Sequence, residues 1–253
     1  MPPIEGFPPD MVYLAGQTLQ TIEQFDWGDP EPDDTRLVQN CVRLTRVPLS
    51  QFDDEDLNAL IGQQMSLETL LPIALGALGV DPWLEAGCLY PGALAATVSR
   101  VEDDYWDPHP DQAAAFRGIV GGMLAVVEAD PWCVPPTYAE GLPADAVGAI
   151  TEIADRYWAA HPGQAEALAA VVDRLMATME ADPGFIAPSG PYYMPGVALR
   201  AVQGLTDHYW RAHPDQRARL DRIVARAWDM GLFTEKLDGP RPTPPPPDTQ
   251  GTH

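Results

Sequence analysis

Basic residues are scarce in this chain. Only 15 of its 253 residues are Lys or Arg, against 37 Asp or Glu, and the formal net charge is −22. Nucleic acids and anionic membrane surfaces are therefore disfavoured as partners, because like charges repel. A protein that carries positive charge is the natural counterpart, although the same acidity also suits solubility or a salt-adapted proteome.

Cysteine is rare as well. Cys41, Cys88 and Cys133 are an odd number without the spacing of a zinc site or a redox motif, which argues against a disulfide framework and fits a reducing cytoplasm. The N-terminus has no basic segment followed by an apolar run, and no window approaches about 18 consecutive apolar residues. The sequence therefore predicts a cytoplasmic protein that does not span a membrane.

Hydrophobic residues make up 45% of the chain, which is enough to form a packed core. No segment alternates as a strand does, whereas apolar residues spaced by three and four predict short helices over 35–45, 53–64 and 66–79. The remaining pattern is an internal repeat. Tyr-Trp recurs at 105, 157 and 209, followed each time by His-Pro at 109, 161 and 213 and by Gln at 112, 164 and 216, with a period of 52 residues.

A fixed period of this length with helical patterning is typical of stacked supersecondary units. We expect two helices in each unit. The first begins near Pro91, Pro143 or Pro195 and ends at Tyr-Trp, and the second begins at His-Pro, with the His as its cap and the Gln reaching back as in a capping box. The Tyr-Trp pairs are predicted to pack between helices, and an exposed row of Trp rings for ligand stacking is the alternative.

A series of motifs between residues 25 and 92 resembles a known family. They are Phe25-Asp26-Trp27-Gly28-Asp29-Pro30, Asp53 to Asp56, Leu60-Ile61-Gly62-Gln63-Gln64, Leu71-Pro72-Ile73-Ala74-Leu75, Asp81-Pro82, Glu85 and Tyr90-Pro91-Gly92. The region from residue 20 to residue 106 is similar to immunity proteins of contact-dependent growth inhibition (CDI) systems. The resemblance implies a stoichiometric inhibitor that silences a toxin delivered by a neighbouring cell, with no chemistry or cofactor of its own.

These patterns together predict an all-α fold, a helical bundle or solenoid built from two-helix repeats of 52 residues. Residues 1–14 are expected to be a disordered N-terminus, and 15–107 an immunity-protein-like helical region. The repeats of 108–237 are expected to pack on it as one continuous domain, ahead of a disordered Pro-rich tail at 238–253.

Dense carboxylates are the candidate partner contacts. The residues are Asp53, Asp54, Asp56, Glu102, Asp103 and Asp104. The first three are expected in the first turn of a helix, where acidic residues also favour the positive end of the helix dipole. The second three are expected near the end of a helix, where negative charge is unfavourable, so their placement favours an interaction role.

No catalytic, cofactor-binding or metal-binding residue is assigned. Consecutive carboxylates in a helix point in different directions, and the repeated histidines lie too far apart to share a metal. The preferred hypothesis is an immunity protein that occludes a cognate toxin domain of basic charge, with a nuclease as the suggested class. A metal-assisted hydrolase with carboxylates gathered in a helical cleft, and a helical scaffold that binds host proteins, are the alternatives.

The acidity is concentrated ahead of the last repeat. Residues 197–237 carry 5 acidic and 7 basic side chains, a net charge of +2, whereas 61–196 carry 18 and 4. Four arginines are expected on the exterior of the final helix, because a terminal repeat needs a polar outer face. They are Arg217, Arg219, Arg222 and Arg226.

Overall fold

A computed structural model describes residues 7–31, 33–87, 90–138, 141, 144–182 and 197–231. Within these ranges the regular structure is helical, apart from one isolated bridge between Thr18 and Pro48, and the predicted all-α class is confirmed. The elements are η1 (Pro9–Leu14), α1 (Leu19–Glu23), α2 (Arg36–Leu44), η2 (Leu49–Gln51), α3 (Asp54–Gly62), α4 (Leu67–Val80), α5 (Ala93–Val98), α6 (Asp103–Trp106), α7 (Pro110–Ala129), α8 (Asp145–Thr151), α9 (Asp155–Ala160), α10 (Pro162–Ala181), α11 (Val197–Gln203), α12 (Asp207–Ala212) and α13 (Pro214–Asp229).

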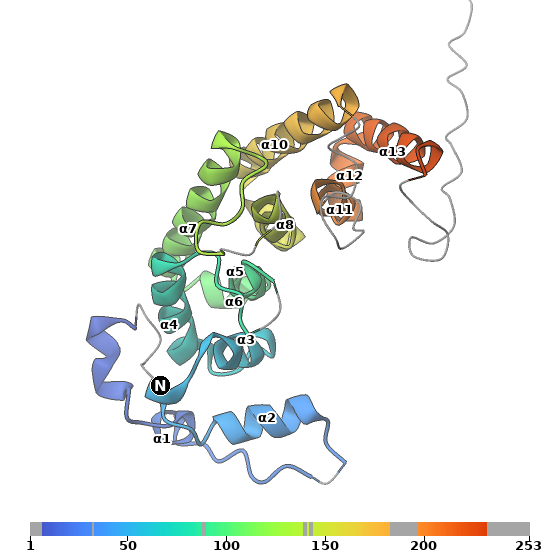
Figure 1. Cartoon of the computed structure of the whole chain (residues 1–253). Helices are drawn as coiled ribbons and strands as arrows, with labels where there is room; N and C mark the ends of the chain where they lie inside the picture. Colours follow the sequence, from blue (N-terminus) through green and yellow to red (C-terminus); the bar gives the residue numbers. More distant parts are fainter. Residues whose placement is uncertain are drawn as a thin grey trace, which may run out of the picture.

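The helices form an arc with an outer and an inner row (Figure 1). The outer row contains α4, α7, α10 and α13, and each of these helices contacts the next. The inner row contains the shorter α3, α5, α8 and α11, which also follow one another in contact. Buried side chains from Leu19 to Ala227 form one hydrophobic cluster between the two rows.

The helices ahead of the repeats lie where their apolar spacing predicts. α2, α3 and α4 correspond to the predicted 35–45, 53–64 and 66–79. Thr35 begins α2 because its hydroxyl accepts a hydrogen bond from the Val38 N–H at 3.3 Å. Pro9–Leu14, which fall within the segment expected to be disordered, form η1 instead. The expected tail at 238–253 lies outside the described residues.

Each repeat unit contains three helices, so the prediction of two is not confirmed. The expected first helix of the first unit is divided into α5, which ends at Val98, and α6, which begins at Asp103. The break leaves the carbonyl of Val101 free to accept the indole N–H of Trp106 at 3.2 Å. The same bond joins Trp158 to Ile153 at 3.0 Å and recurs in the third unit at 2.9 Å.

The long helices begin as predicted, but the neighbouring side chains act differently. α7, α10 and α13 each have Pro as the first residue, where the missing N–H costs no helical hydrogen bond. The preceding histidines make no side-chain cap, and the ring Nδ1 of His109 lies 2.6 Å from the Tyr105 carbonyl instead. The glutamine does not complete a capping box, since Gln112 accepts a hydrogen bond from the Tyr105 hydroxyl at 2.8 Å.

The aromatic pairs lie in the core, as predicted. Tyr157 and Trp158 are 6% and 9% exposed, and the corresponding pair of the third unit is equally buried. Trp106 is half-buried and packs against the same cluster. An exposed row of three Trp rings is therefore excluded.

Glutamines also connect successive units. The Gln164 amide donates to the Arg117 carbonyl of α7 at 3.1 Å, while its carbonyl oxygen accepts from Tyr157. Gln216 repeats this arrangement, 52 residues later, with Ala169 of α10 at 3.0 Å. Each of these glutamines therefore fixes the position of its long helix along the preceding long helix.

Two of the four C-terminal arginines contact the preceding unit: Arg226 is exposed, as predicted, whereas Arg219 is partly buried. Arg219 forms ion pairs with Asp173 at 2.9 Å and Glu180 at 2.8 Å, both on α10. Its guanidinium lowers the pKa of the Glu180 carboxyl. Arg226 donates to the Glu180 carbonyl at 2.9 Å. These contacts join α13 to α10.

Removing the Gln216 side chain should destabilise the fold strongly. Gln216→Ala leaves the buried Tyr209 hydroxyl and the Ala169 carbonyl without their partner. We expect a loss of about 2–5 kcal/mol in the free energy of unfolding, measured by urea denaturation with circular dichroism. Gln203→Ala, at an exposed glutamine of α11, is the control and should change it by less than about 0.5 kcal/mol. Equal effects of the two variants would contradict the bridging role.

The buried tyrosines should make the fold sensitive to alkali. Burial, with a smaller contribution from the charge of Glu68, raises the pKa of Tyr105 to about 12, and burial also raises the pKa of Tyr157 and Tyr209. An unfolded tyrosine titrates near pH ~10, so their contribution is complete below that pH and is lost as the pH rises through ~12. The melting temperature should fall across this window, together with the rise in tyrosinate absorbance. The triple Tyr→Phe variant at these positions should show a flatter dependence, and an unchanged slope would refute this origin.

Candidate protein-binding surface

Asp53 and Asp56 have a structural role at the start of α3. The Asp53 carboxylate accepts from the Asp56 N–H at 2.9 Å, and the Asp56 carboxylate accepts from the Asp53 N–H at 3.3 Å. This capping box satisfies two N–H groups that the helix cannot pair itself. The predicted helix start is confirmed. The capping box explains the presence of both carboxylates, and no partner protein is needed to explain them.

The environment of Asp56 agrees with this role. Burial, and after it the nearby charge of Asp53, raise the pKa of Asp56 above its ordinary value. Arg43 of α2 offsets part of this effect from 3.8 Å. Asp54 is partly exposed, and its carboxylate accepts from the Glu55 N–H at 3.1 Å. Of the three candidates in this group, Asp54 is the most available to a partner.

Glu102, Asp103 and Asp104, here named the acidic turn, lie at the beginning of α6 and not near the end of a helix. Glu102 is the residue before the helix, and the two aspartates form its first turn. Negative charge is favourable at the start of a helix, so the expectation that these carboxylates occupy an unfavourable position is wrong. All three side chains are exposed, and Glu102 makes no cap hydrogen bond. Their availability rests on exposure alone.

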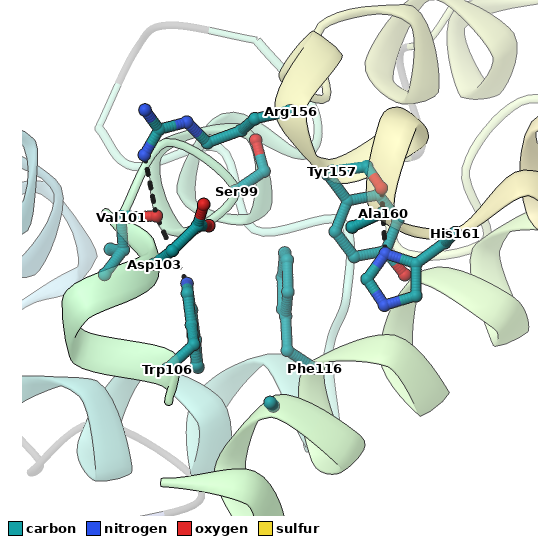
Figure 2. A pocket seen from close by; sticks show the side chains of 10 residues that line it. Ser99, Val101, Asp103, Trp106, Phe116, Arg156, Tyr157, Ala160 and His161 are labelled. Carbon is teal, nitrogen blue, oxygen red and sulfur yellow. Dashed lines mark hydrogen bonds between the residues drawn. The ribbon is translucent and has the colours of Figure 1, made fainter. Parts of the chain in front are cut away.

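A cavity of about 120 Å³ separates the acidic turn from the second unit. Figure 2 shows the Trp106 and Phe116 rings parallel to one another, with Asp103 and the Arg156 guanidinium on the side of Trp106 and with Tyr157 and His161 on the side of Phe116. The ring centroids of Trp106 and Phe116 are 5.9 Å apart. The cavity is therefore an apolar slot with one carboxylate and one guanidinium at its edge.

Asp103 differs from its counterpart in the next unit. Asp155, 52 residues later, accepts a hydrogen bond from the Thr206 hydroxyl at 2.5 Å. The residue that corresponds to Thr206 beside Asp103 is Ala154, which has no hydroxyl. Arg156 donates to the Val101 carbonyl at 3.3 Å and forms no ion pair with Asp103. The Asp103 carboxylate is thus free to accept hydrogen bonds from another molecule.

The loop between α1 and α2, residues 24–34, carries surface features that received no role from the sequence. Its Phe25 and Trp27 rings are 54% and 43% exposed and meet edge to face, with centroids 5.1 Å apart. The Phe25-Asp26-Trp27-Gly28-Asp29 motif is visible in the sequence, but its exposure is not. The sequence offered one signal for this exposure: two aromatic residues occur in a segment that has no helical apolar pattern.

The structure does not join the candidate carboxylates into one cluster. α3 packs against α5, which leads to α6, but no hydrogen bond or ion pair connects Asp53–Asp56 with the acidic turn. Among the residues that the structure describes, no group of three or more His, Cys, Asp or Glu side chains could hold a metal ion. The described surface combines exposed charges at the starts of helices with exposed aromatic rings on the loop between α1 and α2.

Fold and surface therefore define an acidic, all-α binding protein of stacked helices. Residues 21–115, from α1 into α7, match the family model of CDI immunity proteins. The resemblance predicted from the motifs is confirmed. No curated protein and no solved structure matches the chain.

One helix of the described part, α7, has the length and composition of a membrane span. Five of its seven large apolar side chains are buried, Ile119 and Val126 are partly buried, and the helix contacts α4, α8 and α10. The buried side chains are Phe116, Val120, Met123, Leu124 and Val127. Packing within the stack accounts for the apolar composition of α7.

Substitution of Asp53 separates capping from charge. Asp53→Ala removes the cap of α3 and should lower the free energy of unfolding by about 1 kcal/mol. Asp53→Asn removes the charge but retains a capping oxygen, and should cost less than about 0.5 kcal/mol. Thermal or urea unfolding measures both. If the two variants are equally unstable, charge and not the cap is what Asp53 contributes.

Proposed function

We propose that this protein is a cytoplasmic immunity protein that binds a cognate toxin domain and neutralises it by stoichiometric occlusion. The match of residues 21–115 to CDI immunity proteins carries the proposal. The toxin domain is basic, and a nuclease is the class that best fits, because an enzyme that acts on nucleic acid presents positive charge around its active site.

Electrostatics support a basic partner. The net charge of −22 produces a long-range field that attracts cations, and exposed carboxylates within the matched region offer contacts. Such complementarity speeds association and orients the partner, whereas affinity depends on a few buried anchor residues. Association should therefore be fast at low salt and slower as ionic strength increases.

The candidate contacts differ in their availability. Asp53 and Asp56 are engaged in the capping box of α3. The acidic turn is exposed, and the Asp103 carboxylate has no internal hydrogen-bond donor. We assign the electrostatic contact to the acidic turn and to Asp54, and a structural role to Asp53 and Asp56.

The architecture supports inhibition by binding. A curved stack of helices presents an extended concave face to a partner, as helical repeat proteins do. The cavity at Asp103, at about 120 Å³, is smaller than the roughly 300–1,000 Å³ of typical small-molecule sites. It suits a single side chain of a partner better than a separate substrate.

Co-expression tests the function. The probe is the C-terminal domain of any large secreted protein encoded beside this chain, and the readouts are growth of the cells and co-purification. Rescue with a one-to-one complex supports immunity. An active toxin, a soluble wild-type chain and no rescue would overturn the proposal and favour a scaffold that binds host proteins.

Neutralising the acidic turn should slow association with this toxin domain. Glu102→Gln/Asp103→Asn/Asp104→Asn is expected to lower the association rate about 10-fold at low salt and to weaken its salt dependence. Stopped-flow or surface-based kinetics measures the rate. The matched control, Glu128→Gln/Glu152→Gln/Glu166→Gln, removes three exposed charges outside residues 21–115 and should have a smaller effect. Equal rates for the two variants would contradict a specific contact at α6.

A further inference from the structure

The aromatic rings of the α1–α2 loop are exposed without a folding role. Phe25 and Trp27 are 54% and 43% exposed, whereas Trp158 and Trp210 of the Tyr-Trp pairs are 9% and 6% exposed. Large aromatic side chains bury most of their surface when they contribute to a core. Folding of this chain therefore leaves the apolar area of both rings unused.

The loop holds the two rings in a defined position. Arg46, which follows α2, donates to the Gly28 carbonyl at 2.6 Å and to Asp29 at 2.8 Å. It also pairs with Asp26 at 3.5 Å, and these contacts raise the pKa of Arg46. Gly28 adopts a φ of +72° and donates to Asp26 at 2.9 Å, a turn that suits glycine. Phe25 precedes this turn and Trp27 lies within it, so little conformational freedom is lost when the pair is bound.

A second apolar contribution lies next to the loop. The apolar stripe of α2 is buried at Cys41 and Val42, but its first turn exposes Leu37 and Val38 by 44% and 42%. The loop runs alongside α2. Arg46 binds the loop beyond the C-terminal end of the helix, and Gln39 donates to the Asp34 carbonyl near its N-terminal end. Figure 1 shows this pair of segments at the N-terminal end of the arc. Loop and helix together expose four apolar side chains.

Charge identifies the kind of partner. Residues 24–34 contain five acidic side chains and no basic one, namely Asp26, Asp29, Glu31, Asp33 and Asp34. An apolar centre with a charged rim is the anatomy of a protein interface, and here the rim is negative. A second copy of this chain would bring two such rims together, and residues 232–253, with three acidic and two basic side chains, are not complementary either. The rim fits a basic protein surface.

We infer that Phe25 and Trp27 are the anchor residues for the toxin domain, which inserts them into an apolar pocket on its basic surface. The inference rests on the proposed function and gives it a location. The acidic turn contributes to the association rate, whereas the aromatic pair determines the lifetime of the complex. Arg46 is a positioning residue that holds the pair.

Kinetic comparison of variants of the full chain tests this assignment. The probe is the purified toxin domain that the co-expression experiment identifies. Phe25→Ala/Trp27→Ala should weaken binding at least about 30-fold, mainly through faster dissociation, with unchanged melting temperature. Val12→Ala/Tyr13→Ala removes apolar surface that is 59% and 73% exposed outside the loop, and should leave dissociation unchanged.

Arg46→Ala provides an independent readout. It adds one net negative charge, so association with a basic partner should become slightly faster, yet it releases the turn, so dissociation should also become faster. A purely electrostatic role of the loop predicts faster association with unchanged dissociation, and that result would overturn the anchoring role.

The outcomes separate this inference from the function on which it rests. If the wild-type chain neither rescues growth nor binds the toxin domain, the proposed function fails, and the inference fails with it. If the wild type binds and Phe25→Ala/Trp27→Ala binds equally well, only the anchor assignment is overturned. A wild-type chain that dimerises without toxin, and becomes monomeric in this variant, would assign the surface to a second copy and also overturn it.

Discussion

The stack depends on the pairing of the polar groups that each unit buries with its aromatic residues. A buried Trp needs a partner for its indole N–H, and in each unit the carbonyl at the break between the two short helices accepts it, as Ile153 does for Trp158. A buried Tyr hydroxyl needs a partner as well, and Gln164 supplies it while donating to the preceding long helix. Apolar faces alone could slide along one another, whereas these directional bonds fix one register between units.

Features determined by local rules were predictable from the sequence. The period of 52 residues, proline at the first position of each long helix and burial of Tyr157 and Trp158 follow from spacing and composition. The division of the first helix in each unit was not predictable, because it depends on which carbonyl receives the indole. The roles of His109 and Gln112 were mistaken for the same reason. Both resemble capping residues locally, yet they pair with Tyr105, which the fold places beside them.

The candidate site shows the same division. The cap at Asp53 follows a short sequence pattern and was located correctly. The acidic turn was placed at the wrong end of a helix because the break before Asp103 was not recognised. The exposure of Trp27 depends on Arg46, which lies 19 positions further along the chain and determines the shape of the loop. Contacts of this range have no signature in the spacing of neighbouring residues.

The units beyond the family match contribute to the surface of the matched region. Gly92, in the left-handed conformation at φ +79°, approaches α8 so closely that an added Cβ would lie 3.0 Å from the Ala149 side chain. Part of the wall of the cavity beside Asp103 comes from α9, through Arg156 and Tyr157. Loss of the second unit would expose the apolar side chains of α7 and remove that wall. The repeats thus complete the acidic turn as well as the core, which gives the matched region a physical reason to be followed by further units.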